Sequence, residues 1–147
     1  MRPLPFFFYG TLLDGSDNPV AREVHRLLEP MGEAEAAGVL YAIPDEAGWF
    51  PALVAGQGAV HGRLYVPRAG FDAADLARLD AYEDFDPADL AGSLYVREEI
   101  GLESGGRAQV YRFNQPLPEG AQPIPGGDFR GWLAETGLAQ FTGLREA

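Results

Sequence analysis

The sequence predicts an α+β fold in which five or six strands and two or three helices occur in separate groups and do not alternate. Apolar and aromatic runs of strand length fill most of the chain, and helical spacing is confined to a few segments. The 19 Gly and 12 Pro residues predict many turns and therefore short elements. A chain of 147 residues has the length of one domain, so we expect residues 1–147 to form a single unit around a sheet or small barrel.

A buried strand and a helix are expected first. Residues 4–9 are apolar and aromatic, which predicts a strand, and a glycine-punctuated loop over residues 10–15 follows it. Asp17-Asn18-Pro19 has the capping and proline signals of a helix start. The apolar stripe of this helix is formed by Val20, Val24, Leu27 and Leu28, and Pro30 is expected to end it.

Three strands are expected next, over residues 39–43, 50–54 and 59–66. Residues 44–48 break the first from the second, and Gly56-Gln57-Gly58 is expected to turn the chain into the third. Pro51 lies inside the middle strand, which favours an edge position or a bulge there.

The clearest helix spans residues 71–84. Asp72 suits the N-cap, and Asp75 three residues later completes a capping box. Phe71 and Leu76 are spaced as a hydrophobic staple across this start. The buried face is expected to contain Leu76, Leu79 and Tyr82.

A hairpin and a short helix are expected in the last third of the chain. Residues 94–103 and 108–114 predict two strands joined around Gly105-Gly106. The proline- and glycine-rich residues 115–127 predict a loop. A final helix over residues 128–135 is expected to pack Phe129 and Trp132.

Charge and missing residue types exclude several classes of protein. The net charge of -11 and the pI of about 4.4 disfavour nucleic acid and anionic membranes as partners. All 11 basic residues are arginine, which excludes Schiff-base, cofactor-anchoring and P-loop lysines. The absence of cysteine excludes disulfides, thiolate catalysis and cysteine-based metal sites. With only His25 and His61, on separate predicted elements, a histidine-rich metal site is not expected.

The sequence favours a cytoplasmic location. The apolar run before Tyr9 is too short for an export signal, and no small-residue cleavage site follows it. No run approaches the roughly 18 apolar residues that a membrane span needs.

The segment Tyr9-Gly10-Thr11-Leu12 is the first candidate binding feature. Gly10 permits a tight backbone, and successive N–H groups after a strand can hold a carboxylate in a nest. The alternative is an ordinary strand-to-loop turn with Tyr9 in the core.

The densest negative charge lies at the end of the clearest helix and comprises Asp80, Glu83, Asp84 and Asp86. Such a cluster is usually a solvated helix end. Glu83, however, occupies a position where the helix dipole and the neighbouring carboxylates disfavour an anion. Inside an apolar pocket Glu83 would therefore retain its proton toward neutral pH, as a general base and acid requires.

Three residues on the predicted hairpin are further candidates. Tyr95 and Arg97 alternate with apolar residues and so share one face of their strand. They either line a site, or Arg97 neutralises nearby acids. Tyr111, on the next strand, is either a core aromatic residue or part of a pocket wall.

In their order along the chain these short motifs resemble the gamma-glutamylcyclotransferase-like family, in its branch of small bacterial and plant avirulence-induced-gene-like proteins. The similarity runs from about Phe8 to Trp132. The motifs are Tyr9-Gly10-Thr11-Leu12 with Gly15 and Asn18, Phe50-Pro51-Ala52-Leu53, Val60-His61-Gly62-Arg63-Leu64-Tyr65, Leu79-Asp80-Ala81-Tyr82-Glu83, Tyr95-Val96-Arg97, Val110-Tyr111 and Gly127-Asp128-Phe129-Arg130.

The resemblance implies a small mixed β-barrel with flanking helices, and it implies that Glu83 is the catalytic residue. A γ-glutamyl amine or peptide would cyclise to 5-oxoproline as its α-amine attacks its own γ-carbonyl, and Glu83 would move the proton. No cofactor or metal is implied, and the partner is a small γ-glutamyl metabolite. The implied substrate-binding residues are Tyr9, Gly10, Thr11 and Leu12 at the cavity floor, with Tyr95, Arg97 and Tyr111.

The sequence departs from the family at three positions. Leu13 replaces a common basic residue, Arg63 replaces a common acidic residue, and Asp84 stands where Gly often follows the catalytic Glu. The last two concern the rim of the pocket more than its chemistry. Glutathione, γ-glutamyl amino acids and γ-glutamyl-lysine-type amines all stay open as substrates.

Two other functions stay open. One is a non-catalytic module that binds a small metabolite on the same fold. The other is a carboxylate hydrolase that uses Asp80 with Glu83, which share a helical face. Against the hydrolase, helix carboxylates usually face water, and we expect this of Asp80.

Overall fold

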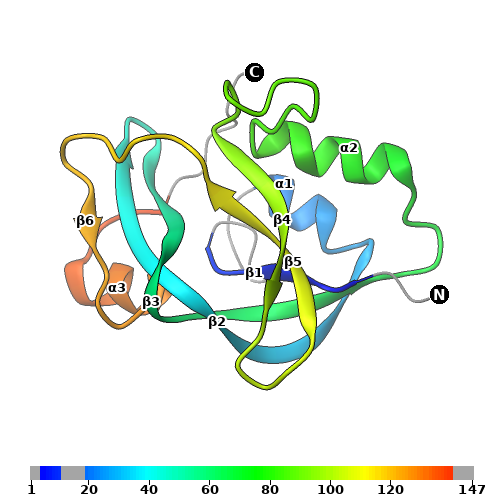
Figure 1. Ribbon diagram of the computed structural model, residues 1–147, viewed down its shortest axis with the longest axis horizontal. Helices are drawn as coiled ribbons and strands as arrows, with labels where there is room; N and C mark the ends of the chain where they lie inside the picture. Colours follow the sequence, from blue (N-terminus) through cyan, green and yellow to red (C-terminus); the bar gives the residue numbers. More distant parts are fainter. Residues whose placement is uncertain (1–3, 11–18, 141–147) are drawn as a thin grey trace.

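The computed structural model describes residues 4–10 and 19–140. Over these residues a six-stranded sheet curls into a half-barrel, with three helices around it (Figure 1). The strand order is β4-β5-β1-β3-β2-β6, and the sheet is mixed because β1 runs parallel to β5 and antiparallel to β3. The predicted α+β class is confirmed. Within the described ranges no helix has the length and apolar composition that crossing a membrane requires.

The central strand is β1 (Phe6–Phe8), and all three of its residues are buried. Because side chains alternate along a strand, Phe6 and Phe8 enter one hydrophobic cluster and Phe7 enters another on the opposite face. The predicted buried strand is confirmed, and its phenylalanines supply both faces of the sheet.

The helix α1 (Pro19–Val24) is shorter than predicted. Leu28 begins β2 and is fully buried there, so packing in the sheet overrides the helical stripe that the sequence indicated. Pro30 therefore does not end the helix but pairs with Tyr65 inside the sheet. Proline lacks the N–H that a strand on each side would require. It is compatible with this part of β2 because β6, on the other side of β2, pairs only with Tyr41 and Ala42.

Two long strands, β2 (Leu28–Asp45) and β3 (Gly48–Pro67), form the curved wall of the half-barrel (Figure 1). The prediction of three separate strands is wrong because Gly56-Gln57-Gly58 continues β3 and does not turn the chain. A register shift between Ala37 and Val39 bends the pair at this point. A Cβ on Gly58 would lie 2.8 Å from the carbonyl oxygen of Gly38, so the glycines serve a close crossing at a bulge.

The remaining elements follow the sequence closely. The helix α2 (Ala73–Tyr82) starts with the predicted capping box, in which the Asp75 N–H donates to Asp72 Oδ1 at 3.0 Å. The strands β4 (Tyr95–Gly101) and β5 (Arg107–Phe113) form the predicted hairpin. A two-residue strand, β6 (Gln122–Pro123), lies in the predicted loop, and α3 (Phe129–Thr136) is the predicted final helix.

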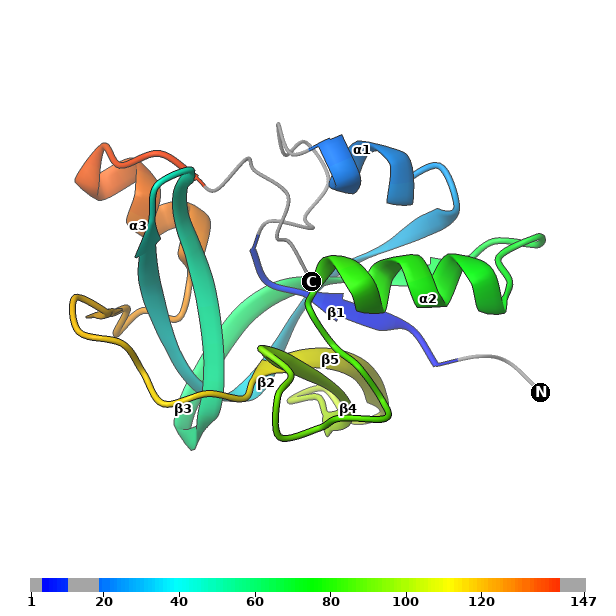
Figure 2. The same ribbon diagram turned by 90° about the horizontal axis from the view of Figure 1, so that it is seen from above.

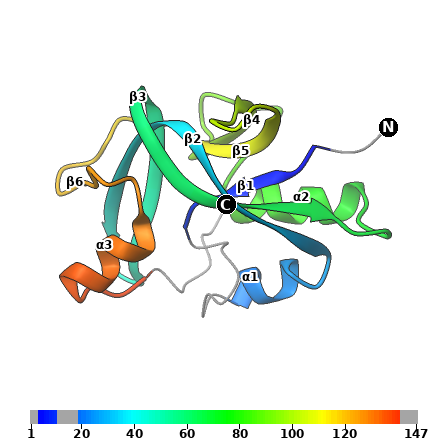
Figure 3. The ribbon, with the colours of Figure 1, turned by 90° about the horizontal axis from the view of Figure 1, so that it is seen from below.

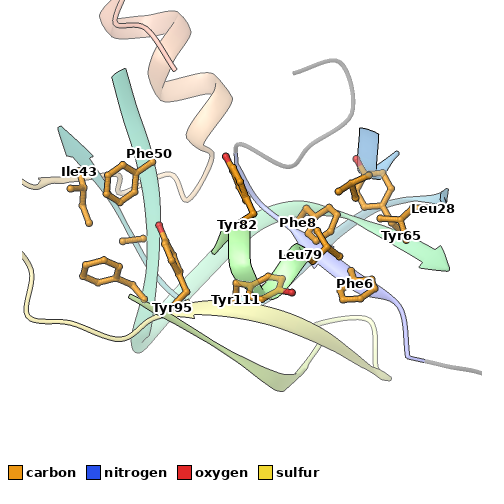
Figure 4. Close-up of a cluster of buried hydrophobic side chains, with 13 residues drawn as sticks. Phe6, Phe8, Leu28, Ile43, Phe50, Tyr65, Leu79, Tyr82, Tyr95 and Tyr111 are labelled. Carbon is orange, nitrogen blue, oxygen red and sulfur yellow. The ribbon is translucent and has the colours of Figure 1, made fainter. Parts of the chain in front are cut away.

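The helices lie in two places around the sheet. α1 and α2 lie together near β1, and α3 lies at the other end of the molecule beside the β2–β3 pair (Figures 2 and 3). Val24, Leu79 and Tyr82 from α1 and α2 belong to the first hydrophobic cluster, which Figure 4 shows. Phe129 and Trp132 of α3 pack in the second, as predicted.

Candidate functional site

The last turn of α2 carries two carboxyl side chains into the protein. Asp80 and Glu83 are each only 6% exposed, and the buried residues Leu79 and Tyr82 belong to the same turn. The expectation that Asp80 faces water is therefore wrong. Carboxylates are rarely buried unless they are paired, and the partners of Asp80 come from β4 and β5.

Backbone hydrogen bonds fix the helix end that carries Glu83. Glu83 is the C-cap, and Asp84 after it has a φ of 55°, in the left-handed region. The N–H groups of Asp84 and Phe85 donate to the carbonyls of Ala81 (3.1 Å) and Asp80 (2.9 Å). This pattern is a Schellman motif, whose left-handed position is usually glycine. It gives a physical reason for the glycine that often follows the catalytic Glu in the resembled family.

A two-point ion pair holds Asp80 to Arg97 on β4. Arg97 Nε donates to Oδ1 at 2.9 Å and Nη2 donates to Oδ2 at 3.3 Å, while Nη1 donates to Gln109 on β5 at 2.8 Å. Burial lowers the pKa of Arg97, but the hydrogen bond and charge of Asp80 outweigh it and leave this pKa above its ordinary value. The structure therefore gives Arg97 an acidic partner, as expected if this arginine neutralises a nearby acid.

Tyr111 completes this network from β5. Its hydroxyl donates to Asp80 Oδ1 at 2.6 Å. Burial raises the pKa of Tyr111 well above its ordinary value, the negative charges of Asp80 and Glu83 raise it further, and Arg97 opposes them. Tyr111 is therefore a neutral hydrogen-bond donor, and it lies close enough to Glu83 for the two groups to interact electrostatically.

Two tyrosine hydroxyl groups form hydrogen bonds with the backbone of β3. Tyr95 donates to the carbonyl of Pro51, and Tyr9 accepts from the N–H of Leu53 at 3.4 Å. Tyr9 also donates to the carbonyl of Tyr111 on β5. These bonds of Tyr9 and Tyr95, which we call the tyrosine seam, join β3 to β4 and β5 through side chains.

Gly10 lies directly against the tyrosine seam. A Cβ at this position would overlap the ring of Pro51, so the close approach requires glycine. The backbone is therefore tight at Gly10, as the sequence predicts. Thr11 and Leu12, the next predicted binding residues, lie outside the described residues, as does Leu13.

Most of the candidate residues come together around the end of α2. The Tyr111 carbonyl accepts a hydrogen bond from Tyr9, and the Tyr111 hydroxyl shares Asp80 with Arg97. The charge of Glu83 contributes to the raised pKa of Tyr111. Tyr95 belongs to the same hydrophobic cluster as Tyr111, and Figure 4 shows the rings of both in it. Tyr95 and Arg97 lie on one face of β4, as predicted.

Sequence reasoning missed two partners of this network, Gln109 and the carbonyl of Pro51. Gln109 is two residues before Tyr111 and so faces the same side of β5, where it bonds Arg97. Its polar side chain in a largely apolar strand was the available signal. No sequence pattern marks the Pro51 carbonyl, because its partner Tyr95 is 44 residues away.

A separate cavity of about 540 Å³ lies between β3 and α3. None of Glu83, Tyr95, Arg97 and Tyr111 lines it. Its polar lining includes His61, Arg63, Asp128 and Arg130. Arg63, which replaces a common acidic residue of the resembled family, therefore lines this cavity. In the part of the chain that the structure describes, no three His, Asp or Glu side chains are placed to hold a metal ion.

The mixed half-barrel, with a buried glutamate at the end of a helix, defines the class of protein. The sequence matches the family model described as "Gamma-glutamyl cyclotransferase, AIG2-like" over residues 6–131, so the chain belongs to this family. Among curated proteins, none matches the sequence significantly.

Solved structures from three kingdoms share the fold. An uncharacterised protein from Pyrococcus horikoshii is 18% identical, with a TM-score of 0.64 over 92% of this chain and 97% of that chain. An AIG2-like protein from Mus musculus is 23% identical, with a TM-score of 0.59 over 81% and 82%. Allophanate hydrolase from Kluyveromyces lactis is 14% identical, with a TM-score of 0.70 over 92% of this chain but 22% of that chain. At these identities the likeness concerns the fold.

Proposed function

We propose that this protein cyclises the glutamyl part of a small γ-glutamyl amine or peptide to 5-oxoproline, with Glu83 as general base and acid. The observation that carries the proposal is the burial of Glu83, which is 6% exposed at the C-terminal end of α2. Asp80, the other buried carboxylate of this turn, is bonded to Arg97 and Tyr111. Membership of the family supports the reaction class.

The proposed reaction moves two protons from the attacking nitrogen to the leaving nitrogen. Glu83 accepts the first proton from the substrate's α-ammonium group, and the resulting amine attacks the γ-carbonyl carbon to form a tetrahedral intermediate. The bond to the leaving nitrogen then breaks as Glu83 returns this proton to that nitrogen. The attacking nitrogen, now in the ring, gives up its second proton to the released amine, so the products are 5-oxoproline and the amine in its ammonium form. Because the attack is intramolecular, holding the bent substrate conformer supplies much of the rate.

Substrate binding is assigned around this base. The backbone of Tyr9, Gly10, Thr11 and Leu12 would hold the α-carboxylate, and the tight approach of Gly10 to Pro51 supports a fixed backbone there. Tyr95, Arg97 and Tyr111 would frame the site from β4 and β5. The Asp80–Arg97 ion pair argues against the two-carboxylate hydrolase, because both oxygens of Asp80 are bonded to Arg97.

The test is 5-oxoproline release from glutathione, γ-glutamyl amino acids and γ-glutamyl-lysine, for the wild type and Glu83→Gln. We expect release by the wild type and a loss of at least about a hundredfold in Glu83→Gln, as for removal of a general base. Glu98→Gln is the matched control, since it makes the same change on β4 in a half-exposed ion pair with Arg112.

Three outcomes separate the possibilities. Release that survives Glu83→Gln would refute the assigned base and leave the reaction. A folded wild type that binds one of these compounds without releasing 5-oxoproline would favour a metabolite-binding module. Neither binding nor release by any compound of the panel would count against the γ-glutamyl substrate class.

A further inference from the structure

Tyr111 has one hydroxyl proton, and the structure assigns it to Asp80. The Oη–Oδ1 distance of 2.6 Å is that of a short hydrogen bond to a charged acceptor. The group is neutral, because its pKa lies well above the ordinary tyrosine value. A neutral phenol that donates to Asp80 cannot donate to another carboxylate at the same time.

Glu83 is the other buried carboxylate in the last turn of α2. Asp80 and Glu83 are three residues apart at the end of α2, so they lie on one side of the helix, and both are buried. The charge of Glu83 is one cause of the raised pKa of Tyr111, which places the two groups within electrostatic range. Asp80 and Glu83 are therefore competing acceptors for a single proton donor.

Arg97 decides this competition in favour of Asp80. Its two hydrogen bonds fix both oxygens of Asp80, and Gln109 in turn holds Arg97 from β5. The Asp80 side chain is thus held in one orientation, with Oδ1 directed at Tyr111.

We propose that Asp80 is a positioning residue for the reaction: held by Arg97, it binds the Tyr111 hydroxyl proton and so keeps this donor away from the Glu83 carboxylate. The inference rests on the proposed function of Glu83 as the base. A hydrogen bond from Tyr111 to Glu83 would stabilise the ionised carboxylate and make it a weaker proton acceptor. Asp80 therefore preserves the basicity of Glu83 without contacting the substrate.

The test removes the ion pair without leaving a buried charge. In Asp80→Leu/Arg97→Met, apolar side chains of similar size replace both partners, a change that buried ion pairs often tolerate. Tyr111 then loses the acceptor that holds its proton, and the inference predicts that it donates to Glu83 instead. We expect kcat for 5-oxoproline formation to fall about tenfold, because a weakened base slows the proton transfer.

The decisive variant adds Tyr111→Phe to this pair. With the misdirected donor removed, kcat should rise again by at least about threefold over Asp80→Leu/Arg97→Met. A purely structural role of the network predicts the opposite, since each further loss of a contact would lower the activity further. Thermal unfolding of each variant separates effects on kcat from loss of folded protein.

The matched control replaces an ion pair between β4 and β5 that lies outside this network. Glu98 and Arg112 lie 2.6 Å apart on β4 and β5, and Glu98→Leu/Arg112→Met should leave kcat unchanged. An unchanged kcat in Asp80→Leu/Arg97→Met, or a further fall when Tyr111→Phe is added, would overturn the inference and leave the proposed function intact. An inactive wild type would overturn the proposed function itself, and the inference with it.

Discussion

Replacement of Asp84 by glycine should stabilise this protein. Asp84 follows the C-cap of α2 with a φ of 55°, and its N–H and that of Phe85 complete the Schellman motif. Glycine adopts this conformation without the steric cost that a side chain incurs. The aspartate also places a negative charge at the C-terminal end of the helix, where the dipole disfavours it.

The expected gain is the balance of three contributions. Release from the left-handed conformation contributes about 1.5 kcal/mol, and removal of the carboxylate from the helix end contributes about 0.5 kcal/mol. The greater freedom of glycine in the unfolded chain costs about 1 kcal/mol. The net gain is about 1 kcal/mol, which raises the Tm of a chain of this size by about 3 °C.

Urea and thermal unfolding of Asp84→Gly, Asp84→Asn and Asp84→Ala test the separate contributions. Asp84→Asn removes the charge but keeps a side chain that tolerates the left-handed region, so it should gain only about 0.5 kcal/mol. Asp84→Ala keeps the strain and should be less stable than Asp84→Asn. If Asp84→Gly unfolds at a lower temperature than Asp84→Asn, the argument from backbone strain is wrong.

Three further predictions concern the tyrosine seam and Tyr111. Gly10→Ala should lose about 2 kcal/mol of stability in urea unfolding, because its Cβ overlaps the Pro51 ring; Gly101→Ala, in open space on β4, should change little. Tyr9→Phe should lose about 2 kcal/mol, since it leaves two backbone groups without their partner. The pKa of Tyr111 is raised on folding, so its contribution to stability is complete below the ordinary value of 10.0 and declines as pH rises through the folded value. Stability above about pH 10 should therefore fall less steeply in Tyr111→Phe than in the wild type.

Local signals predicted the elements that local interactions form. The capping box of α2, the Gly105-Gly106 hairpin and the short helix α3 each involve residues close in sequence, and all three are present. The β2–β3 pair was mispredicted because a bulge between distant glycines is indistinguishable in sequence from a turn. Leu28 was placed in a helix by its spacing, yet burial against the sheet decides its conformation.

The same distinction applies to the candidate site. The residue types and the order of the motifs named Glu83, Arg97 and Tyr111 as candidates, because each lies in a short recognisable motif. The state of Asp80 could not be predicted, since its burial depends on an arginine 17 residues away and a tyrosine 31 residues away. A helical pattern indicates which side of a helix a carboxylate occupies, but packing against the sheet determines whether that side is exposed to solvent.

The tyrosine seam has a consequence for how this fold can change. Between neighbouring strands, peptide groups fix the separation, so substitution of a side chain leaves that spacing unchanged. Along Pro51–Leu53, phenol side chains make the connection instead, and their reach sets the separation from β4 and β5. A single substitution at Tyr9 or Tyr95 therefore alters the width of the half-barrel at that point and leaves every strand in register.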